Sequence, residues 1–473
     1  MRGGNTVKKR AIAILCLLTM AISMVASGCQ GKVVAYKRGT PVPYYKNTWR
    51  GIDEDVFFIS GYIGPQATYA ANGYQLPSLL TDEVYAMLAE CGINNITEQR
   101  MDIESEVGAQ ALSLAAKYGI TYLMRCTSVI NAESKDPNGI YCATTEEITA
   151  KLEGILNKYE NLSGIYVSDE PPSSCYPRLA DVVKSIEAAR ETLGASDFQG
   201  YINAYPNIGW RQLSNDTDET MTWTKYLSSL AETGIDYLMF DMYPYTNVPG
   251  EVSAGWLNSL GTINKIAKEY QLPWYGYIQC GGGRPSFTAS HRVVNEGEMN
   301  YNVGSMLAFG CKGLSYYTLV AIPEGAPLGE EYVNNDSILN KYGTKTPFFY
   351  YAKKINAQLQ AMAPVILNAA HEGVILDNQD SPNVYTGDDL LESYRCLKGY
   401  SGDGALIGCL DYEGTVALVV VNNSIENNHA VITLEFDENY AYEVTQRAQK
   451  FDLSGKEISL HLEVGEFALV VVQ

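Results

Sequence analysis

The acidic residues best suited to proton transfer are Asp169, Glu170 and Asp241. Asp169 and Glu170 are adjacent and precede two prolines, and Asp241 precedes a Met-Tyr-Pro-Tyr run. Two carboxylates side by side in a shielded cleft are costly to ionise together, so one pKa should rise and that group could serve as a general acid. The structural alternative is that Asp169 caps the following helix and that Glu170 pairs with Arg125 or Arg178.

A second group of side chains could bind a substrate. The chain has 35 tyrosines against 5 tryptophans and 11 phenylalanines. A tyrosine combines a flat apolar face with a hydroxyl, which suits sugar surfaces, although ordinary tyrosine-rich packing is the alternative. The candidate substrate contacts are Tyr62, Glu98, Asn203, Tyr205, Tyr243, Tyr245, Gln279, Tyr316 and Tyr317.

Two tryptophans and two further acids complete the candidates. Trp210 and Trp256 follow the expected fifth and sixth strands, where an exposed indole would stack on a sugar ring. Glu98 and Glu298 are weaker candidates for a second carboxylate. Glu298 lies in the first turn of an expected helix, where an acid also interacts favourably with the helix dipole, so we expect a structural role for it.

Eight short β-rich segments position these side chains, and a helical pattern follows each of them. The expected strands cover residues 56–64, 93–98, 120–126, 164–168, 199–203, 236–241, 274–279 and 313–319. The expected helices cover residues 81–91, 104–118, 145–159, 177–193, 219–233, 256–270, 296–309 and 347–361. Gly92, Gly119, Gly234 and Gly313 fit the helix C-cap position that precedes a strand.

Regular alternation of strands and helices predicts parallel strands. Eight such units close into a (β/α)8 TIM barrel, here over residues 56–367, and the candidate residues above follow its strands. Active sites in this fold lie at the C-terminal ends of the strands. An open doubly wound sheet is the alternative, but no glycine-rich dinucleotide turn follows the first strand.

The residues at the expected strand ends exclude several kinds of chemistry. None of the four histidines ends a strand, which disfavours a His-ligated metal hydrolase. No Gly-x-Ser-x-Gly elbow and no phosphate-binding glycine loop occurs in the sequence. We therefore expect neither a metal nor a cofactor. Paired carboxylates with aromatic and amide side chains are what cleavage of a glycosidic bond requires.

Three segments carry a resemblance to bacterial (β/α)8 glycoside hydrolases. Residues 164–171, Gly-Ile-Tyr-Val-Ser-Asp-Glu-Pro, resemble the signature of their fourth strand. Residues 240–245 resemble their sixth strand, and residues 308–318 resemble the passage from the last helix into the last strand. The resemblance covers the barrel, and a trailing β-domain is also usual there. It implies a carbohydrate substrate without indicating which sugar.

The resemblance leaves the second catalytic carboxylate open. In the large clan with two catalytic glutamates, Glu170 would be the acid/base, but the strand-7 nucleophile position holds Gln279, which cannot play that part. In substrate-assisted hexosaminidases, an Asp-Glu pair follows strand 4, so Asp169 would orient the substrate's own acetamido group as nucleophile. Asp241 is the third possibility. The rival hypothesis is a carbohydrate-binding protein on a barrel that lost its catalytic partner.

The first residues indicate export. Lys8, Lys9 and Arg10 precede a short apolar run that ends in Ala-Ser-Gly-Cys, so residues 1–28 fit a lipoprotein signal peptide and Cys29 the lipidated residue. Residues 29–55 are expected to be a tether from the membrane lipid to an extracytoplasmic protein. The chain has 34 basic and 54 acidic residues, a net charge of −20, which disfavours nucleic acid as a partner.

From about residue 370 the helical period disappears. Short β-rich runs cover residues 404–410, 415–421, 429–435, 442–446, 456–462 and 467–472, so residues 368–473 are expected to form a small antiparallel β-sandwich. The cysteines form no Cys-x-x-Cys pair, and several should be buried thiols. An exported chain could carry disulfides, and the shortest candidate loops join Cys126 to Cys142 and Cys396 to Cys409.

Overall fold

The computed structural model describes residues 32–71, 74–131, 140–207, 220–245, 251–281, 293–321, 337–377, 383–426 and 429–473. The expected signal peptide 1–28, the expected lipidation residue Cys29 and Trp210 lie outside these ranges. Within them, no helix has both the length and the apolar character needed to cross a membrane.

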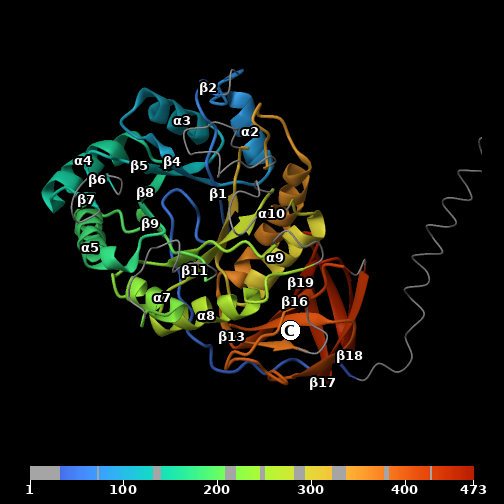
Figure 1. Cartoon of the computed structure of the whole chain (residues 1–473). Coiled ribbons are helices and arrows are strands. Elements are labelled where there is room, and N and C mark those ends of the chain that lie inside the picture. Colours follow the sequence, from blue (N-terminus) through green and yellow to red (C-terminus); the bar gives the residue numbers. More distant parts are fainter. Residues whose placement is uncertain are drawn as a thin grey trace, which may run out of the picture.

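Eight parallel strands form the barrel that the alternating pattern predicts (Figure 1). They pair in the order β10-β11-β12-β1-β4-β5-β8-β9. Ala204, just after β9, donates its N–H to the carbonyl of Met239 in β10 at 2.8 Å and closes the circle. The strands are β1 (Phe58–Tyr62), β4 (Asn95–Asp102), β5 (Thr121–Arg125), β8 (Leu162–Asp169), β9 (Gln199–Asn203), β10 (Leu238–Phe240), β11 (Trp274–Gln279) and β12 (Gly313–Tyr317).

The expected helices surround these strands. They are α2 (Asp82–Glu90), α3 (Glu106–Ala116), α4 (Thr145–Lys158), α5 (Tyr176–Leu193), α7 (Trp223–Ala231), α8 (Trp256–Glu269), α9 (Glu296–Ala308) and α10 (Pro347–Ile366). Side-chain oxygens of Thr81, Ser105, Thr144, Thr222, Asn295 and Thr346 cap helix N-termini. Gly92, Gly119 and Gly234 are left-handed after their helices, as expected, but after α9 that conformation falls on Gly310 and not on Gly313.

Short elements lie in the connections between the strands and helices of the barrel. The hairpin β2 (Tyr69–Ala71) and β3 (Tyr74–Leu76) follows β1, and the hairpin β6 (Ile130–Asn131) and β7 (Tyr141–Cys142) follows β5. A single 3-10 turn, η1 (Ser173–Cys175), leads from β8 into α5. All of these elements fall on the side of the barrel where the strands end.

Aromatic side chains fill the inside of the barrel. Tyr62, Tyr166, Tyr201, Tyr237, Tyr275 and Tyr277 are buried there together with Phe58 and Met239. Trp49 closes the N-terminal end, because its ring stacks on Phe58 at 4.1 Å and its indole N–H donates to the Tyr275 hydroxyl at 3.1 Å. Much of the tyrosine excess is therefore packing, which was the alternative to a sugar-binding role.

The segment expected as a tether, residues 29–55, is packed on the protein along its described part. The N–H groups of Val34, Tyr36 and Gly39 donate to carbonyls of Asn439, Gln473 and Gly414. Figure 1 shows this blue stretch running past the C-terminal strands to the barrel. The tether prediction was wrong for these residues because backbone pairing and the burial of Trp49 leave no free linker.

The C-terminal strands form one antiparallel sheet that bends over itself into the predicted sandwich. Its order is β13-β15-β16-β19-β17-β14, and β18 pairs with β17. Two expected strands are halves of the long β17, whose first half pairs with β14 and whose second half pairs with β19. The strands are β13 (Ala369–Leu376), β14 (Leu397–Gly402), β15 (Ala405–Tyr412), β16 (Thr415–Asn422), β17 (His429–Gln446), β18 (Gln449–Glu463) and β19 (Phe467–Val472).

Strands β13 and β14 were not expected from the sequence. A register shift between His371 and Gly373 breaks the alternation of β13. Strand β14 lies at the sheet edge, contains two glycines and exposes or half-exposes most of its residues. Neither segment therefore shows the apolar alternation by which strands are recognised.

The sandwich packs against the barrel helices α9 and α10 on one face of its sheet. In β16, Ala417, Val419 and Val421 belong to the core shared with the barrel, whereas Leu418 and Val420 belong to the core inside the sandwich. Burial on both faces explains why these strands are apolar along their whole length.

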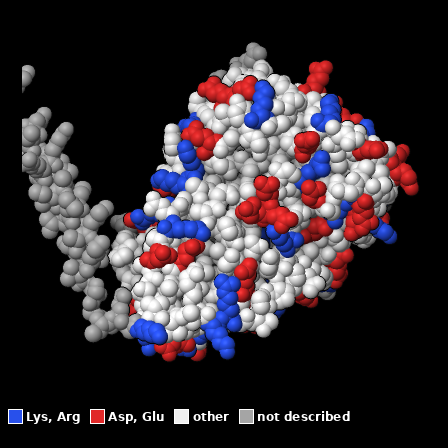
Figure 2. Space-filling view, turned by 180° about the vertical axis from the view of Figure 1, so that it is seen from behind, with Lys and Arg blue, Asp and Glu red and all other residues white. Residues whose placement is uncertain are grey.

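The cysteines in the described part of the chain are all free thiols. This outcome contradicts the Cys126–Cys142 and Cys396–Cys409 disulfides that were considered. On the face seen in Figure 2, Lys and Arg are interspersed with Asp and Glu and do not gather into one large basic region. Acidic side chains are thus distributed over this face.

Gly408 in β15 tests the packing of the sandwich on the barrel. A Cβ at this position would lie 2.4 Å from the carbonyl oxygen of Ala308 and 2.5 Å from its Cα. Gly408→Ala should therefore destabilise the protein by about 1–3 kcal/mol, measured as a lower melting temperature. The matched control is Gly399→Ala in β14, where a Cβ meets nothing within 4 Å. Equal melting temperatures for the two variants would contradict this account.

Candidate active site

Three acidic side chains meet where β8, β9 and β10 end. Asp169 is the last residue of β8, Glu170 follows it, and Asp241 follows β10. Asn203, at the end of β9, lies between them, and its amide Nδ2 donates to Asp169 Oδ1 at 3.0 Å and to Asp241 Oδ1 at 3.1 Å. Glu170 and Asp241 hydrogen-bond each other through their side chains. The structure therefore brings all three candidate catalytic residues together.

The backbone at Glu170 makes this grouping possible. Successive residues of a strand point to opposite faces, so Asp169 and Glu170 would ordinarily diverge. Glu170 has a φ of 47°, in the left-handed region that is unfavourable for a residue with a Cβ. Its N–H donates to the Asn203 carbonyl at 2.9 Å, which stabilises the turn. The turn brings Glu170 to the same cluster as Asp169.

The acids differ in how easily they ionise. Desolvation, together with the negative charges of Asp241 and Asp169, raises the pKa of Glu170 to about 10. Desolvation and the charge of Asp169 raise the pKa of Asp241 to about 7. Near neutral pH, Glu170 therefore holds a proton and donates it in the hydrogen bond to Asp241. A protonated acid beside a carboxylate is the arrangement that general acid catalysis requires.

Asp169 is held by donors from the barrel interior. Its Oδ2 accepts from the Tyr62 hydroxyl at 2.8 Å, and its Oδ1 accepts from the Tyr201 hydroxyl at 3.5 Å. Desolvation raises the pKa of Asp169, but these hydroxyls and the Asn203 amide act in the opposite direction. Asp169 is thus kept as a hydrogen-bond acceptor.

Two tyrosines of this network were not among the residues predicted from the sequence. The hydroxyls of Tyr201 and Tyr277 lie 2.6 Å apart, and Tyr201 continues the contact to Asp169. Both lie inside strands, whereas the predicted site residues lie at strand ends. Counting back two residues from Asn203 and from Gln279 along the same strand face finds them.

Aromatic rings border the acids. The ring of Tyr317 lies 5.3 Å from that of Tyr243 and 6.0 Å from that of Tyr62. Tyr243 and Tyr317 are partly exposed, as is Tyr205 after β9, and so remain candidate substrate contacts. The Tyr205 carbonyl accepts from the Trp223 indole at 2.9 Å, which fixes this loop.

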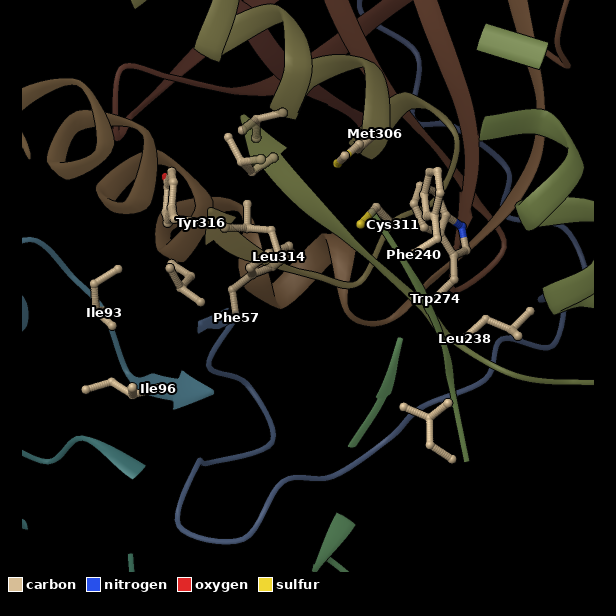
Figure 3. Packing of buried hydrophobic residues seen from close by; sticks show 14 of the residues in the cluster. Phe57, Ile93, Ile96, Leu238, Phe240, Trp274, Met306, Cys311, Leu314 and Tyr316 are labelled. Carbon is tan, nitrogen blue, oxygen red and sulfur yellow. The ribbon is translucent and has the colours of Figure 1, made fainter. Parts of the chain in front are cut away.

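Tyr316 was wrongly expected to contact substrate. It follows Ser315 and precedes Tyr317 on β12, and alternation along the strand sends its side chain out of the barrel. The ring is fully buried among apolar side chains (Figure 3). Its hydroxyl donates to Asn356 Oδ1 in α10 at 2.7 Å. Tyr316 is part of the packing between the barrel and α10.

Gln279 and Tyr245 are also buried in structural contacts. The Gln279 side chain accepts from the Tyr245 N–H at 3.0 Å and donates to the Tyr245 carbonyl at 3.1 Å. The Tyr245 hydroxyl donates to the Glu298 carbonyl at 2.6 Å. These contacts join the ends of β10 and β11, so neither side chain reaches a substrate in this arrangement.

The weaker acidic candidates are structural as well. Glu98 is fully buried and accepts from the N–H groups of Gly64 at 3.0 Å and Arg100 at 2.6 Å. Glu298 forms a capping box with Asn295 at the start of α9, in agreement with the expected structural role. Trp256 is fully buried, with its indole donating to Ser305 Oγ, and offers no exposed ring.

The structural alternative for Asp169 and Glu170 finds little support. The N-cap of α5 is Cys175, without a side-chain hydrogen bond, so Asp169 does not cap this helix. Arg178 donates to the carbonyl of Ile140 at 3.0 Å, and the guanidinium of Arg125 lies 5.5 Å from the centre of the Tyr166 ring. Within the described ranges, no group of three or more His, Cys, Asp or Glu side chains could hold a metal ion.

Comparisons with known proteins show the fold. No protein-family model and no curated protein matches this chain. Among solved structures, the chain is similar to Gan42B, a GH42 β-galactosidase, with a TM-score of 0.57, 10% identity and coverage of 90% of this chain and 99% of that chain. It is also similar to a family 39 glycoside hydrolase from the gut symbiont Bacteroides cellulosilyticus WH2, with a TM-score of 0.50, 12% identity and coverage of 89% and 82%.

The raised pKa of Asp241 predicts a pH-dependent cost in stability. Between the ordinary carboxyl pKa and about 7, the folded protein holds a proton that the unfolded chain has released, so stability falls as pH rises. Asn cannot titrate, so Asp241→Asn should raise the melting temperature more at about pH 8 than at about pH 4. A difference in melting temperature that is the same at both pH values would contradict the assignment.

Proposed function

We propose that this protein is a glycoside hydrolase that cleaves O-glycosidic bonds in oligo- or polysaccharides, with Glu170 as general acid/base. The observation that carries the proposal is the buried contact between Glu170, whose pKa is raised, and Asp241 where strands of a (β/α)8 barrel end. Partly exposed tyrosines beside these acids offer surfaces for sugar rings. The likeness to two glycoside hydrolase structures is in keeping with this function.

The position of Asp241 argues against its being the nucleophile. In glycosidases the two carboxyl groups are about 5–5.5 Å apart in retaining enzymes and about 6.5–9.5 Å apart in inverting ones. Glu170 and Asp241 are in direct hydrogen-bond contact, so a sugar ring does not fit between them. Asp241 instead holds the proton donor in place and raises its pKa. The end of β11 supplies no carboxylate either, because Gln279 occupies it.

We therefore favour a substrate with a 2-acetamido sugar. The acetamido oxygen would attack the anomeric carbon while the glycosidic C–O bond breaks, and Glu170 would transfer its proton to the leaving oxygen. Glu170, now a carboxylate, would then take a proton from the water that opens the cyclic intermediate. Asp169, which the surrounding hydroxyls keep as an acceptor, would receive the acetamido N–H.

The site of action is proposed from the sequence motif around Cys29. We propose that the mature chain is anchored by a lipid on Cys29 to the outer face of a bacterial membrane. Detergent phase partitioning tests this, since wild-type protein from cells should enter the detergent phase and Cys29→Ser should not. Equal partitioning of both would contradict lipid anchoring.

Glu170→Gln tests the proposed catalytic role. Loss of a general acid typically lowers turnover by about 10²- to 10⁴-fold, and the loss should be larger for an alkyl than for a nitrophenyl leaving group, which needs less protonation. The assay is hydrolysis of a panel of glycosides that includes N-acetylhexosaminides. The matched control is Glu153→Gln, on the exposed face of α4.

The panel also separates the alternatives. Cleavage restricted to N-acetylhexosaminides would support assistance by the substrate, and cleavage restricted to sugars without an acetamido group would return the second role to Asp241. Normal activity of Glu170→Gln would eliminate the assignment of Glu170. Binding of glycans without any cleavage by the wild-type protein would favour the carbohydrate-binding hypothesis.

A further inference from the structure

Asn203 contacts each of the three acids. Its amide nitrogen donates one hydrogen to Asp169 and the other to Asp241, at 3.0 and 3.1 Å. Its backbone carbonyl accepts from the N–H of Glu170 at 2.9 Å. The residue is 2% exposed, so a substrate has little access to it. Asn203 was expected to bind substrate, and these contacts indicate a different role.

The two carboxylates determine the orientation of this amide. The reverse orientation would place the amide oxygen against two carboxylate oxygens, which repel it. In the observed orientation, the buried amide oxygen has no hydrogen-bond partner among the described residues. An unpaired buried acceptor is unfavourable, so the amide oxygen does not favour this orientation. The two hydrogen bonds that the amide nitrogen donates to the carboxylates therefore determine it. The observed orientation of the Asn203 amide requires both Asp169 and Asp241 to accept a hydrogen bond from it, as ionised carboxylates do.

We propose that Asn203 is a positioning residue that places the single proton of the acidic cluster on Glu170. The argument deepens the proposed function, because it assigns to one amide the choice of which acid is the proton donor. Asp169 accepts from Tyr62, Tyr201 and Asn203, and Asp241 accepts from Asn203 and Glu170. Two stabilised carboxylates leave Glu170 as the acid that keeps the proton.

Other titratable groups around the cluster do not replace this effect. Among the described residues these groups are tyrosines from three strands, one helix and the segment after β10. Burial raises the pKa of each: Tyr62, Tyr201, Tyr226, Tyr243 and Tyr277. They stay neutral in the working pH range. The net charge of the cluster therefore depends on the protonation of the three carboxyl groups and on the hydrogen bonds that they accept.

Removing the amide should move the proton. In Asn203→Ala, Asp169 and Asp241 each lose a donor, so the pKa of Asp241 rises and Asp241 competes with Glu170 for the proton. Asn203→Asp keeps the shape of the side chain but replaces the donor by a fourth acid, so its effect should be at least as large. Because Asp and Asn are nearly isosteric, this variant also guards against a simple packing defect in the alanine variant.

The proton can be located without any substrate by infrared spectroscopy of protonated carboxyl groups as a function of pH. At about pH 8, above the pKa of Asp241 and below that of Glu170, the wild type should show one protonated carboxyl that disappears in Glu170→Gln. In the double variant Asn203→Ala/Glu170→Gln, a protonated carboxyl should remain, because Asp241 has lost its amide donor. Tyr237→Phe is the matched control, since it removes a buried barrel hydroxyl that donates to the Gly200 carbonyl at 3.2 Å and to none of the three acids, so its spectrum should match that of the wild type.

Activity supplies the second readout. The midpoint of the acidic limb of the kcat–pH profile should lie near the pKa of Asp241. In Asn203→Ala this midpoint should rise by about one pH unit. At the optimum, kcat should fall by about tenfold while KM changes little, which a merely structural defect would not produce. Asn203→Ser, which restores one donor, should recover part of the activity.

The outcomes distinguish this inference from the proposed function. Infrared spectra of Asn203→Ala that match the wild type at every pH would overturn the inference, even where Glu170→Gln abolishes glycosidase activity. A changed proton location in a protein that cleaves no glycoside would support the inference and count against the proposed function.

Discussion

Closure of the barrel between β9 and β10 is the constraint on which the site depends. The Ala204 N–H that pairs with Met239 lies one residue after Asn203 and close to Asp241 in the neighbouring segment. This pairing fixes the spacing of the ends of β8, β9 and β10, so one amide can bridge two carboxylates. A small opening of the sheet at this point would separate the acids and release their shared proton.

The interior of the barrel supports this arrangement from below. A buried carboxylate is unfavourable without donors, and the hydroxyls of Tyr62, Tyr201 and Tyr277 form a connected set beneath Asp169. The apolar parts of the same rings fill the barrel. Tyrosine therefore satisfies two demands at once, because each ring supplies packing volume and places a hydroxyl at its far end.

The remaining parts of the chain stiffen the barrel from outside. The sandwich buries one face of its sheet on α9 and α10, and Gln358 of α10 donates to the Phe467 carbonyl at 2.7 Å. The N-terminal segment crosses the sandwich and ends with Trp49 in the base of the barrel. The mouth, where the acids lie, is at the other end of the strands. Trp49 thus closes the end of the barrel opposite to the acids.

The sequence by itself determined the eightfold alternation, the β-rich C-terminal domain and the acidic segments after the fourth and sixth strands. These features are periodic or local, so residue type and spacing are sufficient to predict them. Only the tertiary structure decided which side chains face the site. Tyr316 and Tyr317 are neighbours of the same type, yet pleating sends one to α10 and the other to the mouth. The pairing of Glu170 with Asp241 likewise required the closed barrel, because no local pattern brings the ends of two separate strands into hydrogen-bond contact.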